Sequence, residues 1–178
     1  GKEIKKARER IQGLDVIVTD HHHVPEVGHP ENISAFINPN QKGCPYPEKT
    51  ICGATVAFLL MVATKKELEK DGFLEPGLSI AKELSFAASS TIADCVSLMA
   101  PTNRAIVQYG IKQMNQYAKP AWQALDQFYH PDTPMNVSSD TLGWKLGPLI
   151  NSNSRMGLNG KIPLSFFLAE SPMEAKEL

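Results

Sequence analysis

The fold is decided by residues 14–23, which read Leu-Asp-Val-Ile-Val-Thr-Asp-His-His-His. Residues 14–19 are rich in β-branched side chains and lack clean alternation, which is typical of a strand buried on both faces of a parallel sheet. The polar residues 20–23 lie just past the carboxyl end of that strand, where open α/β sheets bind their ligands. The sequence therefore predicts a buried strand that delivers a polar cluster to a binding site.

The elements on either side of this stretch indicate an α/β fold. Apolar residues recur at helical spacing over residues 2–12 and predict a helix, which Gly13 ends. A short apolar run at 33–37, closed by Asn-Pro-Asn, predicts a second strand that ends in a turn. A helix that feeds a buried strand is characteristic of α/β domains.

The remainder of the chain is predicted to be helical and to cover the sheet. Helices are expected at residues 53–68, 78–92, 103–116 (Asn103 as N-cap), 120–129 (Pro120 in the first turn), 139–150 and 163–178, with a linker at 131–137. We expect residues 1–136 to form part of a parallel-sheet domain and residues 137–178 a helical connector toward a missing C-terminal domain. Two strands make no stable parallel sheet by themselves, so we expect the chain to be a fragment of a larger protein.

The composition fits one globular domain. Of the 178 residues, 42% are hydrophobic and 21% are charged, which are ordinary values for a folded domain. The net charge of −1 excludes the strongly basic surface of a non-specific nucleic-acid binder, so any phosphate contact must be local. No apolar stretch reaches the roughly 18 residues of a membrane span, so we expect a soluble, cytoplasmic protein with no membrane partner.

The cysteines favour a reducing compartment. Cys44, Cys52 and Cys95 are odd in number and contain no Cys-x-x-Cys pair that would indicate zinc or redox chemistry. We expect Cys52 and Cys95 to be small buried residues.

The cluster Asp20, His21 and His22 has the chemistry of a metal site. A carboxylate and imidazoles on a short turn offer mixed oxygen and nitrogen ligands, which suit Mn²⁺, Zn²⁺ or Fe²⁺ better than Mg²⁺ alone. An exposed polar loop and a purification-tag remnant are the alternatives, but a tag would not follow a buried strand. The sequence therefore predicts a divalent-metal site here.

Two further segments are candidates. Asp94 closes a largely apolar stretch at 84–98, and a buried carboxylate needs a cation or several donors. A helix cap is the simpler explanation of Asp94 and is favoured on the residues alone. Residues 142–157 end in small polar side chains and Arg155, which could donate to a phosphate, although a turn between helices is the simpler reading.

These segments together resemble one enzyme family. Residues 13–22 resemble the third motif of the DHH phosphoesterases, and the elements that follow are similar to the RecJ group of that family. These elements are Ile-Asn-Pro-Asn at 37–40, Ile-Cys-Gly-Ala-Thr-Val-Ala-Phe at 51–58, Thr-Ile-Ala-Asp-Cys-Val at 91–96, and residues 142–155. A lone Asp-His-His triplet is weak, but this ordered set spans nearly the whole chain and is specific.

The resemblance implies a site that this chain carries in part. Upstream Asp residues, absent here, would bind two metal ions, Mn²⁺ or Mg²⁺, together with His21 and Asp94 as ligands of the same ion. Asp20 would orient His21, and His22 would touch the scissile phosphate or the neighbouring ligands. His23 has no assigned role, and residues 1–136 would be the C-terminal part of the DHH catalytic domain.

The resemblance also assigns the connector to substrate binding. Asn151 and Arg155 match the family's phosphate-contacting motif, and the planar donors of Arg can pair with two phosphate oxygens. Leu149 stands where the family typically carries Arg, and Ser154 where it carries Gly. These departures concern the grip on the substrate rather than hydrolysis.

The activity implied is that of a two-metal phosphodiesterase, an exonuclease that degrades single-stranded DNA from 5′ to 3′ and releases 5′-mononucleotides in DNA repair and recombination. A single-strand binding protein or a helicase would be candidate partners, and the isolated chain is expected to be inactive. The alternatives are a DHH phosphodiesterase of oligonucleotides or cyclic dinucleotides, a related pyrophosphatase, and a metal-free scaffold protein. The connector argues against the other enzymes, and the intact Asp20, His21, His22 and Asp94 argue against the scaffold.

Overall fold

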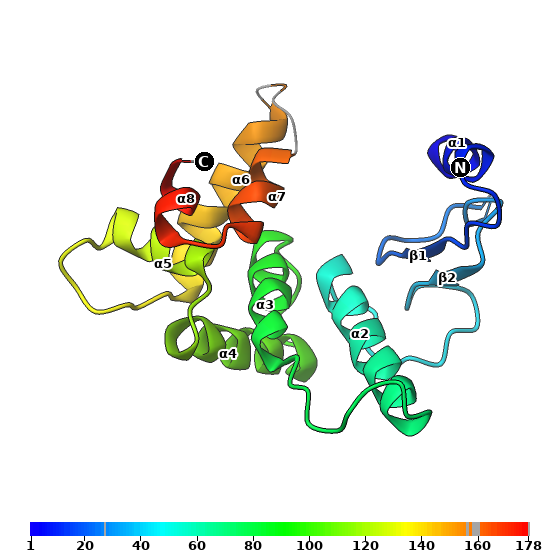
Figure 1. The fold of residues 1–178 in the computed structure, drawn as a ribbon, viewed down its shortest axis with the longest axis horizontal. Helices are drawn as coiled ribbons and strands as arrows, with labels where there is room; N and C mark the ends of the chain where they lie inside the picture. The colour runs from blue at the N-terminus through cyan, green and yellow to red at the C-terminus, as the bar shows by residue number, and fades with distance from the viewer. Residues whose placement is uncertain (27, 156, 158–160, 178) are drawn as a thin grey trace.

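The chain forms a small parallel sheet followed by a succession of helices (Figure 1). The computed structural model describes residues 1–26, 28–155, 157 and 161–177, without the side chains of residues 153–155. The elements are α1 (Lys2–Arg10), β1 (Ile17–Thr19), β2 (Ala35–Ile37), α2 (Gly53–Lys70), the 3-10 turn η1 (Ala81–Glu83), α3 (Leu84–Ala93), α4 (Pro101–Gln116), α5 (Pro120–Tyr129), the π-helical segment η2 (Thr141–Leu146), α6 (Gly147–Arg155), α7 (Lys161–Leu168) and α8 (Pro172–Glu177). The predicted fold class, a parallel-sheet α/β domain with flanking helices, is confirmed.

The two strands pair in parallel, as the strand pattern indicates. Ile17 lies opposite Ala35 and Thr19 opposite Ile37. The expectation of a strand buried on both faces is wrong for the described residues, because Ile17 is 55% exposed. A sheet of two short strands, with α2 packed against β1, does not provide enough protein to cover both faces.

Helix α2 lies between the sheet and the helical body (Figure 1), since it contacts β1 and α3. The body is built around α3 and α4, whose apolar side chains meet those of α5 and η2. The core cluster comprises Ala87, Ala88, Ile106, Met114, Trp122, Leu125, Val137, Leu142 and Leu146. The sheet and the hydrophobic core are therefore separate, and α2 joins them.

Helices α3 and α4 approach closely because small residues face each other. A Cβ built on Gly110 of α4 would collide with the Cβ of Ala88 and lie 2.8 Å from the carbonyl oxygen of Leu84. The Ala- and Ser-rich character of α3 therefore permits a close packing of the two helices, as expected from the sequence.

Several predicted helix boundaries are wrong. Helix α4 begins at Pro101, whose missing N–H is harmless in a first turn, so Asn103 lies inside the helix and is not its N-cap. Its buried amide nitrogen instead donates to the carbonyl oxygens of Thr50 and Ser97, both at 3.0 Å, and ties two loops together. By contrast, the prediction for residues 120–129 matches α5 in both bounds.

The predicted C-terminal helix is interrupted. Residues 163–177 form the end of α7 and all of α8, because Pro172 has no N–H to continue a helix and starts a new one instead. Leu178 lies outside the described residues. The predicted helix at 78–92 is likewise divided into η1 and α3. Throughout the described part of the chain, no helix combines the length and apolarity needed to cross a bilayer.

We predict that Gly110→Ala destabilises the protein. The added methyl group meets the backbone of α3, and overpacking of this kind costs about 1–3 kcal/mol of unfolding free energy, more than alanine's helix propensity returns. Urea denaturation should show a lower midpoint. Gln108→Ala is the control, since Gln108 is exposed on the same helix. Equal midpoints for both variants would contradict the close packing.

Candidate metal site

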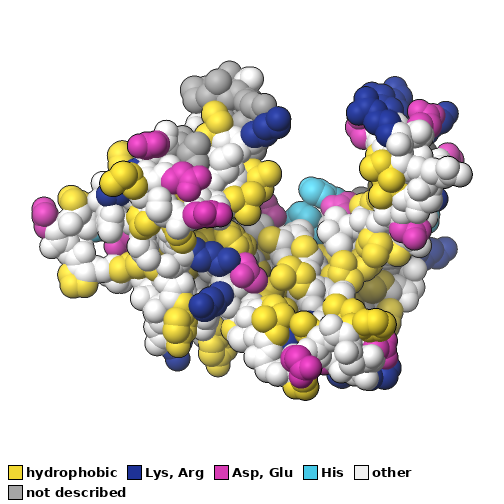
Figure 2. All heavy atoms as spheres, in the orientation of Figure 1, with side chains coloured by type: hydrophobic (Ala, Val, Ile, Leu, Met, Phe, Trp, Pro, Cys, Tyr) yellow, Lys and Arg dark blue, Asp and Glu magenta, His cyan; other side chains and the backbone are white. Residues whose placement is uncertain are grey.

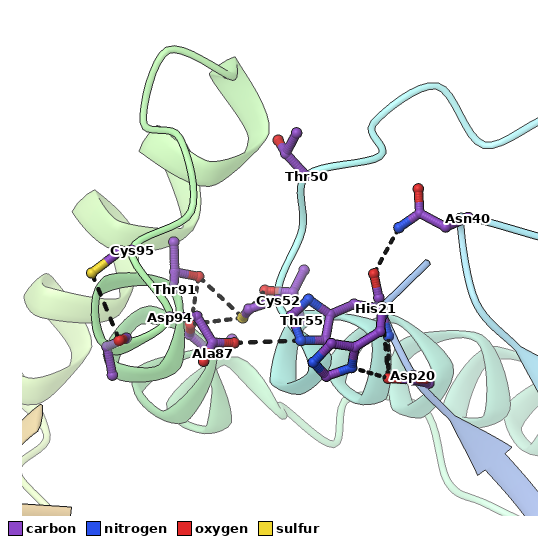
Figure 3. Close-up of polar contacts among 12 residues, drawn as sticks. Asp20, His21, Asn40, Thr50, Cys52, Thr55, Ala87, Thr91, Asp94 and Cys95 are labelled. Atoms are coloured by element: carbon purple, nitrogen blue, oxygen red, sulfur yellow. Dashed lines mark hydrogen bonds and ion pairs between the residues drawn. The ribbon is translucent and has the colours of Figure 1, made fainter. Parts of the chain in front are cut away.

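The structure brings His21 and Asp94 together from distant parts of the chain. The Nε2 atom of His21 lies 3.6 Å from Oδ2 of Asp94, and their side chains are 21% and 42% exposed. His21 follows β1, and Asp94 follows the last turn of α3 (Figure 3). Figure 2 shows histidine side chains at the floor of a hollow between the α1–sheet part and the α6–α7 part. Both side chains of the pair are partly exposed to solvent.

The amino terminus of α2 sets the position of both side chains. A Cβ on Gly53 would lie 3.4 Å from Cδ2 of the His21 ring, so the first residue of α2 is in contact with the imidazole. Just before it, the buried Sγ of Cys52 lies 3.3 Å from Oγ1 of Thr55 and 3.4 Å from Oγ1 of Thr91. Because Thr91 is in the last turn of α3, this contact ties the start of α2 to the helix that Asp94 directly follows.

Two asparagines hold the histidine turn in place. The side-chain amide of Asn40 donates to the carbonyl oxygen of His21 at 2.7 Å, and that of Asn38 donates to the carbonyl oxygen of His22 at 2.9 Å. Asn38 is 2% exposed, and its own Oδ1 accepts the backbone N–H of Asn40 at 2.8 Å. Sequence reasoning assigned these residues to a turn and missed this role. The sequence feature that could have indicated this role is the presence of two asparagines just after the neighbouring parallel strand, β2.

Asp20 organises the turn from the other side. Its Oδ1 accepts the backbone N–H of His21 at 2.7 Å and lies 2.8 Å from Nδ1 of the His22 ring. Partial burial raises the pKa of Asp20, but the hydrogen bonds from the His22 ring and from both backbone N–H groups outweigh it, so the pKa lies below its usual value. Asp20 thus contacts the ring of His22 and the backbone of His21. The predicted role of Asp20, to orient His21, stays a prediction, and the observed contact with His21 is through its backbone N–H.

Asp94 lies at a helix end, as the helix-cap explanation of this residue expects. It occupies the C-cap of α3, and its backbone N–H donates to the carbonyl oxygen of Ser90 at 2.9 Å. A carboxylate there faces the negative end of the helix dipole, which is unfavourable without a nearby cation. The expectation that Asp94 is buried is wrong, because α3 ends at Ala93 and leaves the next residues in an open turn.

Cys95 in the same turn is exposed, so the expectation that it is buried is also wrong. Its φ of +53° is a left-handed conformation, which turns the chain away from α3. Cys52 is 0% exposed, as expected.

The geometry of the pair fits a shared divalent cation. Two ligands that each lie about 2.1 Å from one ion are separated by roughly 3.0–3.4 Å at angles of about 90–110°. The 3.6 Å separation of His21 Nε2 and Asp94 Oδ2 is close to that range. No group of three or more His, Cys, Asp or Glu side chains arranged to hold a metal is found in the described part of the chain. Within the described residues the pair could therefore supply two ligands to a cation, and other groups would have to complete its coordination.

The connector packs against the same end of α3. Residues 142–155 form most of η2 and all of α6, so the turn considered for this segment is wrong through Arg155. A groove of about 590 Å³ separates the end of α3 from the connector. We call it the α3–η2 groove. Its lining residues are Ile92, Ala93, Cys95, Ser139, Asp140, Gly143, Trp144, Gly147, Pro148, Asn151 and Ser152.

The structure describes the side chain of only one of the two predicted phosphate-contacting residues. Asn151 is exposed on α6 and lines the α3–η2 groove, so it lies near the end of α3 that carries Asp94. Arg155 is the last residue of α6, and its side chain lies outside the described residues, as does that of Ser154. Leu149, in the place of the usual Arg, is 49% exposed. His22 is exposed beside the metal pair, where a substrate can contact it.

The family assignment follows from comparison with known proteins. Residues 1–96, more than half of the chain, match the model of the DHH family, N-terminal domain. The chain therefore belongs to the DHH family.

The particular relatives are RecJ proteins, each named a single-stranded-DNA-specific exonuclease. Identity is 37% over 150 residues with the protein of Dickeya dadantii, 34% over 174 residues with that of Escherichia coli and 32% over 177 residues with that of Bacillus subtilis. The matches cover 82%, 95% and 99% of this chain but 25%, 29% and 20% of those relatives, so the chain spans less than a third of their length. No solved structure matches it significantly.

We predict that Gly53→Val displaces the His21 ring. The methyl groups extend from a Cβ already in van der Waals contact with the imidazole, whereas the lone methyl group of Gly53→Ala fits at 3.4 Å. Imidazole ¹H–¹⁵N spectra should show a shifted His21 resonance in Gly53→Val and a nearly native one in Gly53→Ala. An unchanged His21 resonance in the valine variant would mean that α2 does not position the ring.

Proposed function

We propose that the protein carrying this chain is a metal-dependent exonuclease that degrades single-stranded DNA in the 5′ to 3′ direction and releases 5′-mononucleotides. The 3.6 Å approach of His21 and Asp94 carries the proposal, because it places two ligands of different chemistry beside an open hollow. Membership of the DHH family and similarity to proteins named single-stranded-DNA-specific exonucleases support it.

His21 and Asp94 would hold one of two divalent cations, Mn²⁺ or Mg²⁺, and residues outside this chain would complete the coordination. Such a pair of ions, when bound, supplies positive charge that lowers the pKa of a water nucleophile and stabilises the leaving oxygen. The carbonyl oxygens of His21 and His22 are held by Asn40 and Asn38, so the imidazole ligand is presented with little freedom.

His22 would contact the scissile phosphate. The carboxylate of Asp20 accepts a hydrogen bond from the ring at Nδ1, which orients the imidazole and leaves Nε2 for the substrate. The pKa of Asp20 is lowered, chiefly by the hydrogen bonds from the His22 ring and from two backbone N–H groups, so its carboxylate is kept as the acceptor of the bond that orients His22. Asp20 therefore positions His22.

Asn151 and Arg155 would contact the DNA backbone. Phosphate contacts position a strand without reading its sequence, which suits an enzyme that removes one nucleotide after another. With a net charge of −1 the chain offers no broad basic surface, so these contacts have to be local. DNA repair and recombination are the processes that need such an activity, and a single-strand binding protein or helicase would be its partners.

Exonuclease activity can be tested directly. With Mn²⁺ present, the complete protein should convert 5′-labelled single strands to labelled 5′-mononucleotides and leave duplex of the same sequence largely intact. The label should appear in a mononucleotide because cleavage from the 5′ end releases the labelled terminal nucleotide first. Thin-layer chromatography identifies the product. Release of longer oligonucleotides, or cleavage of cyclic dinucleotides alone, would favour the other DHH activities over this one.

Variants separate the metal ligands from the surrounding residues. We predict that His21→Ala and Asp94→Asn each reduce kcat by more than the roughly 10- to 100-fold that loss of an outer-shell partner costs. His23→Ala is the matched control on the same turn and should retain activity. Arg155→Ala should mainly weaken DNA binding. Thermal unfolding should be similar in all four proteins, and a common loss of stability would instead indicate purely structural roles.

A further inference from the structure

Trp144 is an exposed residue of η2, a segment whose other large apolar side chains are buried in the hydrophobic core. It is 81% exposed, whereas Leu142 and Leu146, on either side of it in η2, are 0% and 3% exposed. Because both leucines belong to the hydrophobic core, the exposure of Trp144 is a consequence of how the segment is packed. π-Helical segments are uncommon and occur frequently at functional sites.

The backbone of η2 and α6 lies directly against the end of α3. A Cβ on Gly143 would lie 3.2 Å from Cγ2 of Ile92, and a Cβ on Gly147 would lie 3.8 Å from the Cβ of Ala93. Trp144 is adjacent to the first of these glycines and lines the α3–η2 groove. Ala93 and Cys95, which flank Asp94, line the same groove. The groove therefore reaches both chain neighbours of Asp94.

The lining of the groove suits a nucleobase better than a phosphate. Ser139, Asn151 and Ser152 are neutral hydrogen-bonding groups, and Asp140 is a carboxylate. None of the described lining residues is Lys or Arg. A carboxylate repels phosphate but accepts hydrogen bonds from the amino groups of bases, and an aromatic face stacks on any base. A volume of about 590 Å³ is within the range of small-ligand sites.

We propose that the α3–η2 groove is a nucleobase subsite and that Trp144 is the platform on which a base next to the scissile phosphate stacks. The inference rests on the proposed nuclease function and adds to it where the substrate's base is held. Stacking on Trp144 would place the attached phosphate near His21 and Asp94 without selecting among bases. An enzyme that consumes strands of any sequence requires such tolerance.

The two tryptophans of the chain provide an internal contrast. Trp122 is 0% exposed, so a stacked base can quench the emission of Trp144 but not that of Trp122. In EDTA, which prevents hydrolysis, oligothymidylate should quench part of the emission of the complete protein. Trp144→Phe should lose this quenching and keep most of the affinity, because phenylalanine retains an aromatic face.

Trp144→Leu removes the platform and should raise the Kd for oligothymidylate by about 5- to 150-fold, the effect of losing one stacked base. The control is Phe73→Leu, because Phe73 is equally exposed at 81% and does not line the groove. A strand with one abasic position should bind the wild-type protein more weakly when that position is the one whose base would stack on Trp144. The same abasic strand should raise the Kd of Trp144→Leu only slightly further. The substitution and the missing base each remove the same stacking contact, so their effects should not add.

The outcomes separate this inference from the function on which it rests. If the wild-type protein binds and cuts oligothymidylate while Trp144→Leu does both equally well, the base subsite is overturned and the nuclease proposal stands. A wild-type protein that neither binds nor cuts single strands overturns both. If Trp144→Leu changes only self-association in sedimentation velocity, Trp144 belongs to a contact between copies and the subsite is likewise overturned.

Discussion

The site depends on α2, which contacts both β1 and α3 and so brings an imidazole and a carboxylate within 3.6 Å of each other. Gly53 lies against the His21 ring, while Cys52 contacts Thr91 in the last turn of α3. Because Gly53 and Cys52 are both small, the start of α2 contacts the imidazole on one side and α3 on the other. The close approach of His21 and Asp94 is thus a consequence of packing at one helix terminus.

The surrounding polar groups serve to restrain the backbone of the histidine turn. Asn38 and Asn40 bind carbonyl oxygens and Asp20 binds N–H groups, so the turn after β1 is held from both sides. A ligand that is already oriented loses less entropy when it binds an ion. The carboxylate of Asp94 lies at the negative end of the α3 dipole, where a bound cation would be favourable.

The site is open on the side where a polymer would enter. Histidine side chains lie in a hollow of the surface (Figure 2), and the α3–η2 groove begins at the turn after α3, where Ala93 and Cys95 line it. The connector is therefore more than a spacer, because its glycines let it pack against the turn that holds Asp94. Among the described residues that line the α3–η2 groove, none is Lys or Arg.

The sequence by itself determined the local elements and the family, because β-branched runs, prolines and ordered motifs act over short distances along the chain. It predicted the strand before Asp20, the start of α5 at Pro120 and the pairing of His21 with Asp94 through the resemblance. Only the tertiary structure decided the roles of Asn38, Asn40 and Asn103, the exposure of Cys95 and Ile17, and the division of the last helix. Those features depend on which distant backbone atoms and side chains meet, and local patterns carry no record of them.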